Sequence, residues 1–189
     1  MREIDIRNAL RDQVRSQHAH ESDTLILDEL GLCQGISRVD IAAINGSLHG
    51  YEIKSPNDTL ERLPSQKEVY GKSLDYVTLV TAREHLSKAQ KIVPKWWGLV
   101  IPTRQGSAID FELIREPQRN KEVDRFALVQ LLWRDETLRE LETLGVDRGL
   151  RSKPKQVLWD CLANCVELAV LGVIVRTALK RRGTIWRAW

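Results

Sequence analysis

The sequence predicts an α/β protein in which helices flank a mixed central sheet and a helical extension follows at the C-terminal end. Two apolar segments on either side of Asn45-Gly46 have the pattern of a β-hairpin. A further apolar segment at 75–81 follows a helical crossover, which favours parallel pairing with the hairpin. From Lys121 onward, apolar residues recur at helical spacing.

The chain begins with a segment, 2–17, that has the pattern of an amphipathic helix. Ile6, Leu10 and Val14 recur at helical spacing between charged residues, so we expect this helix to pack on the sheet. The apolar segment 24–32 is expected to be the first strand, although its periodicity alone also allows a short helix.

Turn signals and apolar runs alternate after the hairpin. Pro64 suits the first position of a helix, in which Gln66 and Tyr70 would lie one turn apart on the same side. The other elements expected in this part of the chain are a strand at 75–81, a helix at 83–93, and strands at 96–102 and 108–115.

Two long helices are expected in the extension, one that ends at Gly145 and one over 155–182. We therefore divide the chain into a core, 1–118, and an extension, 119–189. Basic residues gather near the C-terminus, where they are either an exposed patch that neutralises phosphates or a solvated helix end: Arg176, Lys180, Arg181, Arg182 and Arg187.

Composition sets broad limits on what the protein does. The 189 residues carry a net charge of +3, which by itself favours no particular partner, and three cysteines with no paired spacing typical of zinc sites. The first twenty residues lack the apolar stretch of a signal peptide, and charged residues interrupt the apolar segment at 157–179. We expect a protein of the reducing cytoplasm with no membrane partner; the oligomeric state stays open, and a homodimer is compatible with the sequence.

Acidic and basic side chains in the hairpin suggest chemistry. On a strand, Glu52 and Lys54 share one face while Ile53 points into the core. Mg²⁺ or Mn²⁺ is bound by one or two carboxylates together with water and phosphate, which Asp40 and Glu52 would supply. Lys54 would then stabilise charge on the phosphate or orient the attacking water.

The hairpin loop decides whether this metal site is possible. A plain two-residue turn at Asn45-Gly46 would place Asp40 and Glu52 on opposite faces of the sheet. A three-residue loop from Ile44 to Gly46, with Gly46 left-handed in a bulge, would place them on the same face. We therefore predict an odd-length loop or a bulge.

The order of these residues resembles a known superfamily. Asp40, then Glu52-Ile53-Lys54, then Gln66 and Tyr70, resembles the PD-(D/E)XK nucleases, with the Gln/Tyr pair of the RecB-type branch. The stretch Gly50-Tyr51-Glu52-Ile53-Lys54-Ser55-Pro56-Asn57-Asp58, followed by Gln66, is similar to the VRR-Nuc branch. The nearest resemblance is to a bacterial family of uncharacterised nuclease-like proteins, and two further stretches carry it: Arg38-Val39-Asp40-Ile41-Ala42 and Pro94-Lys95-Trp96-Trp97-Gly98. The resemblance covers about residues 29–98, roughly half of the chain. Val39 stands where the superfamily often has proline.

This resemblance implies a restriction-endonuclease-like core and a Mg²⁺- or Mn²⁺-dependent deoxyribonuclease of bacterial or phage origin. An upstream acid often completes the metal site; Glu29 and Glu3 are both candidates, and Glu29 is favoured because it lies on a strand beside the hairpin. The implied catalytic residues are Asp40, Glu52, Lys54 and Gln66. The implied metal ligands are Asp40, Glu52, Glu29 and the Ile53 carbonyl. The nucleic-acid contacts expected are Tyr70, Lys67, Arg62, Ser55, Arg181 and Arg182.

Two other interpretations stay open. A regulatory or nucleic-acid-binding protein can keep the same fold without cutting, because fold does not imply function. Cleavage of structured RNA would use the same residues, since the chemistry concerns the phosphate. In a purely structural interpretation, Tyr70 is a core aromatic residue and Gln66 its exposed neighbour.

Overall fold

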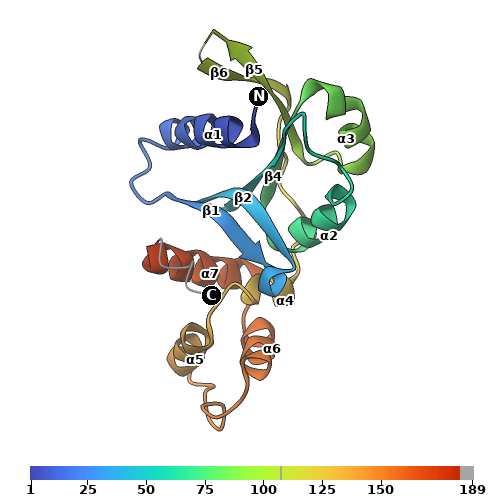
Figure 1. The fold of residues 1–189 in the computed structure, drawn as a ribbon. Helices are drawn as coiled ribbons and strands as arrows, with labels where there is room; N and C mark the ends of the chain where they lie inside the picture. Colours follow the sequence, from blue (N-terminus) through green and yellow to red (C-terminus); the bar gives the residue numbers. More distant parts are fainter. Residues whose placement is uncertain (107, 184–189) are drawn as a thin grey trace.

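The structure, a computed structural model, describes residues 1–106 and 108–183 and confirms the predicted α/β class (Figure 1). Six strands form one sheet in the order β1-β2-β3-β4-β5-β6. The sheet is mixed, because the β3–β4 and β4–β5 pairs are parallel and the other pairs are antiparallel. The strands are β1 (Leu25–Leu32), β2 (Ser37–Ile44), β3 (Leu48–Lys54), β4 (Tyr76–Thr81), β5 (Gly98–Gln105) and β6 (Ala108–Arg115).

Helices cover both faces of the sheet (Figure 1). On one face, Ile6, Leu10 and Val14 of α1 (Glu3–Gln17) pack on the sheet, as predicted. On the other face, one continuous apolar core joins the sheet to all of the remaining α-helices. These are α2 (Leu63–Ser73), α3 (Leu86–Ile92), α4 (Arg125–Val129), α5 (Arg134–Thr143), α6 (Lys155–Cys165) and α7 (Leu168–Arg182); the short η1 (Cys33–Gly35) and η2 (Arg83–His85) complete the list.

The helical extension is present, but each of its two expected helices is divided. The helix expected to end at Gly145 is α4 followed by α5, and the one expected over 155–182 is α6 followed by α7. Between α6 and α7 the backbone is extended at Val166 and Glu167, and Arg125 of α4 donates to the Val166 carbonyl oxygen at 3.1 Å. The break lets both α6 and α7 contact α4, which a single straight helix does not allow.

The hairpin loop has odd length, as predicted, although its position differs. Ile44 pairs with Leu48, so the loop is 45–47 rather than 44–46. Gly46 is not among the glycines with positive φ, because the Asn45 side chain closes the turn by accepting a hydrogen bond from the Ser47 backbone at 3.0 Å. Continued by one pair, this register places Asp40 opposite Glu52.

Close packing on β3 fixes the position of α2. A Cβ atom on Gly50 would lie 2.5 Å from Leu74 Cδ1, at the end of α2, and 2.9 Å from Val39 Cγ2. Glycine at this position therefore lets the end of α2 approach the sheet. None of the helices in the described part of the chain has the length and apolar character needed to cross a bilayer.

Candidate functional site

Asp40 and Glu52 line one cavity of about 400 Å³. The cavity lies between the beginning of α1, which contributes Glu3 and Arg7, and the beginning of α2, which contributes Gln66. The structure thus brings together the two carboxylates that the sequence predicted to be neighbours.

Glu52 is buried and bonded entirely within the chain. Its Oε1 accepts from Lys54 Nζ at 2.5 Å and from Gln66 Nε2 at 2.6 Å. The Tyr70 hydroxyl lies 2.6 Å from Glu52 Oε2 and 2.7 Å from the Arg38 carbonyl oxygen. Burial and the adjacent Glu52 charge raise the pKa of Tyr70, so this hydroxyl stays a donor.

Asp40 is also engaged on both oxygens. Oδ1 pairs with Arg7 at 2.7 Å, and Oδ2 accepts the Ile53 backbone N–H at 2.7 Å, where β2–β3 pairing has ended. Burial, followed by repulsion from the Glu52 charge, raises the pKa of Asp40 from 3.8 to about 7. Near neutral pH this carboxyl group is therefore partly protonated.

Arg7 contacts Asp40 and both candidates for the third acidic ligand of the predicted metal site, Glu29 and Glu3. Besides Asp40, it contacts Glu3 at 2.5 Å and Glu29 at 3.6 Å. Glu29 has a φ of 54° and also contacts Arg38 at 3.4 Å. In the described residues, no group of three or more histidine, cysteine, aspartate or glutamate side chains is placed to hold a metal ion.

These contacts decide whether the site can hold a divalent ion. Ile53 supplies its N–H to Asp40, and Glu29 pairs with arginines. The half-buried Asp40 faces Arg7, and the buried Glu52 faces Lys54. The buried Gln66 Oε1 is an acceptor without a hydrogen-bond partner. As arranged, the residues do not fit Mg²⁺ or Mn²⁺, because cations of the protein itself occupy the positions next to the carboxylates.

The residues expected to contact nucleic acid are divided between surface and interior. Tyr70 and Ser55 are buried, and Ser55 donates to Asp58 Oδ2 through both its backbone N–H, at 2.7 Å, and its hydroxyl, at 2.6 Å. Arg62 and Arg181 are exposed, and Lys67 is half-buried next to Glu68. Burial removes Tyr70 and Ser55 from the surface that a nucleic acid can reach.

Among the described members of the predicted basic stretch near the C-terminus, Arg181 is exposed and the others pair with acidic residues. Arg182 is buried, pairs with Glu136, and donates to the Leu131 carbonyl oxygen at 2.7 Å. Arg176 pairs with Asp75, and Lys180 pairs with Asp23 in the exposed loop before β1. Arg187 lies outside the described residues.

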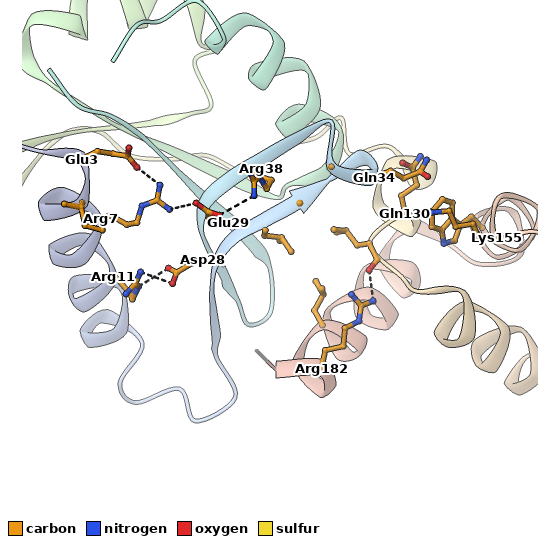
Figure 2. Close-up of a pocket in the computed structure, with 17 residues that line it drawn as sticks. Glu3, Arg7, Arg11, Asp28, Glu29, Gln34, Arg38, Gln130, Lys155 and Arg182 are labelled. Carbon is orange, nitrogen blue, oxygen red and sulfur yellow. Dashed lines mark hydrogen bonds and ion pairs between the residues drawn. The ribbon is translucent and has the colours of Figure 1, made fainter. Parts of the chain in front are cut away.

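The sequence analysis did not identify Arg7 as a site residue, although its guanidinium contacts three acidic residues there: Glu3, Glu29 and Asp40. The available signal was the spacing of Glu3, Arg7 and Arg11 along α1, directly beside its apolar stripe. Sequence analysis gave these charged residues no role, whereas the structure turns Arg7 toward β1 and β2, where its guanidinium lies next to Glu29 (Figure 2).

The fold and the site together define a class: an α/β protein with a mixed six-stranded sheet and an acidic pair, Asp40 and Glu52, that is neutralised by basic side chains of the same chain. A family model described as bacteriophage P4 protein cII matches residues 1–185, and the chain belongs to this family. A curated relative, protein cII of Enterobacteria phage P4, is 29% identical over 164 residues, which are 85% of this chain and 60% of the relative. The chain thus spans about 60% of that relative's length. No solved structure matches.

Family membership corrects the functional prediction. The assignment to the PD-(D/E)XK nuclease superfamily was wrong, and the prediction of a DNA-cutting hydrolase is contradicted with it. The physical reason lies in the motif itself. Glutamate and lysine two apart on a strand share a face whether they hold a metal or each other, and here they hold each other.

Proposed function

We propose that this protein is a regulatory protein that binds nucleic acid without cutting it. The observation that carries the proposal is the engagement of all four oxygens of Asp40 and Glu52 by groups of the chain itself. Carboxylate groups whose oxygens are all hydrogen-bonded in this way stabilise one arrangement of the cavity. Held in this way, Asp40 and Glu52 leave no open position for a reacting phosphate.

DNA is the proposed partner, and the support comes from the rim of the same cavity. Arg38 and Arg62 line the cavity and are exposed, and Lys67 follows on α2. Basic side chains of this kind contact phosphates and give affinity without reading sequence. Binding of Mg²⁺ or Mn²⁺ at Asp40 stays a prediction, and it requires Arg7 to leave.

Fluorescence anisotropy of labelled duplex DNA, with single-stranded DNA and RNA in parallel, tests the proposal. The double substitution Arg38→Gln with Arg62→Gln should weaken duplex binding and lower the salt slope by about one to two units, because each lost phosphate contact removes roughly one. Arg139→Gln is the matched control, since Arg139 is exposed on α5, away from the cavity.

A nicking assay on supercoiled plasmid, with and without Mn²⁺, is run on the same preparations. Binding without nicking is the expected result. Metal-dependent nicking that Lys54→Met abolishes would overturn the proposal, and so would a salt slope that the double substitution leaves unchanged.

A further inference from the structure

A second, larger cavity of about 920 Å³ lies between α1, β1 and the C-terminal helices (Figure 2). Its size is within the range of small-molecule sites, roughly 300–1,000 Å³. It adjoins the acidic cavity, because Glu3, Arg7, Glu29, Gly35 and Arg38 line both. We call the larger cavity the effector cleft.

The effector cleft has an apolar wall formed from both parts of the chain. Leu30 comes from β1, Leu131 from the α4–α5 connection, and Trp159 and Leu179 from α6 and α7. Ile4 of α1 also lines the cleft and is 49% exposed. This wall suits the apolar body of a ligand rather than a hydrated nucleic-acid backbone.

Polar side chains gather at one end of the cleft. Gln34, Gln130 and Lys155 line the cleft, and Figure 2 draws all three at the same end of it. Among the described residues, none of the three side chains has a hydrogen bond or ion pair, and the Lys155 ammonium lies 4.9 Å from the centre of the Trp159 ring. Lys155 is also the first residue of α6, whose N-terminus has no side-chain cap.

The opposite end of the cleft is different, because its charges are already compensated. Arg11 contacts Asp28 at 2.8 Å, and Arg7 contacts Glu3 and Glu29. Within the part of the chain that the structure describes, Lys155 is therefore the charged lining residue without an ion-pair partner, at the end of the cleft that Gln34 and Gln130 also line. Cys33 and Gln34, at the same end of the cleft, have φ values of 48° and 59°, which non-glycine residues rarely adopt.

We propose that the effector cleft binds a small amphipathic organic anion. Its carboxylate or phosphate group would accept hydrogen bonds from Lys155, Gln34 and Gln130, and its apolar body would lie on Leu30 and Leu131. An anion is favoured over a cation because this end supplies an ammonium, two amides and the positive end of α6. The inference is independent of nucleic-acid binding at the acidic cavity.

Titration with the fluorescent probe anilinonaphthalene sulfonate, an apolar ring system with one negative charge, tests the inference on the full chain. One saturable site is expected. Decanoate should displace the probe, and decylamine, with the same chain length and opposite charge, should not. A probe that both compounds displace equally well, or that neither displaces, would contradict the inference.

Two substitutions locate the site. Lys155→Gln should weaken decanoate binding about tenfold, through loss of one charge-assisted hydrogen bond; Lys88→Gln, at an exposed position on α3, should leave it unchanged. Ile4→Trp should block the cleft, whereas Val170→Trp, at a position 47% exposed on α7, should not. Circular dichroism melts confirm folding of each variant. Equal effects of either substitution and its control would reject the site.

Discussion

Asp40→Asn tests the electrostatics of the acidic cavity. The carboxyl group has a pKa of about 7 in the folded protein and 3.8 as its ordinary value. The folded protein therefore holds a proton that the unfolded chain has lost over this interval, and stability falls as the pH rises through it. Linkage gives a loss of about 2.5 kcal/mol of unfolding free energy between about pH 5 and about pH 8.

The assay is urea unfolding of the wild type and the variant at several pH values across this interval. Asparagine can still accept the Ile53 N–H, but it carries no charge, so the variant should lose the part of the pH dependence that Asp40 contributes. Asp12→Asn, exposed on α1, is the control and should follow the wild type. Parallel curves for wild type and Asp40→Asn would refute a raised pKa at this carboxyl group.

Two further predictions concern the packing that holds the site and the extension together. Gly50→Ala would place a Cβ atom 2.5 Å from a leucine methyl carbon and should cost about 1–3 kcal/mol of unfolding free energy, whereas Gly46→Ala, with no atom within 4 Å, should cost little; urea midpoints distinguish them. Arg182→Leu would leave the Glu136 carboxylate, whose side chain is 14% exposed, without its main partner and should cost about 3–5 kcal/mol. Arg181→Leu, at the exposed neighbouring position, should change the urea midpoint far less, and equal losses for the two arginines would contradict the buried pairing.

The sheet was predictable because its signals are local. The alternation around Asn45 and the apolar run at Tyr76–Thr81 depend on neighbouring residues, and they gave the hairpin and the parallel strand. The parity of the loop was also predictable, since Asp40 and Glu52 lie on the same side only if the loop has odd length. The exact loop residues were not, because the Asn45 side chain closes the turn without a left-handed glycine.

The extension was harder to predict because its breaks depend on distant partners. Periodicity alone extends one helix from Lys155 to Arg182, and nothing local at Val166 indicates the break. Arg125, which lies 41 residues earlier, holds the carbonyl group at the break. The local excess of basic residues also failed to predict that Arg182 is buried, since its partner, Glu136, is 46 residues away.

The same limit explains why the chemistry of the site was mispredicted although its members were found. Asp40, Glu52, Lys54 and Gln66 do meet, as the spacing required. What they do is decided by Arg7, which reaches Asp40 across 33 residues of sequence. An acidic pair facing open solvent attracts a metal ion, whereas the same pair facing an arginine and a lysine is neutralised within the protein. Because the two outcomes share one local motif, the motif predicts the cavity and not its chemistry.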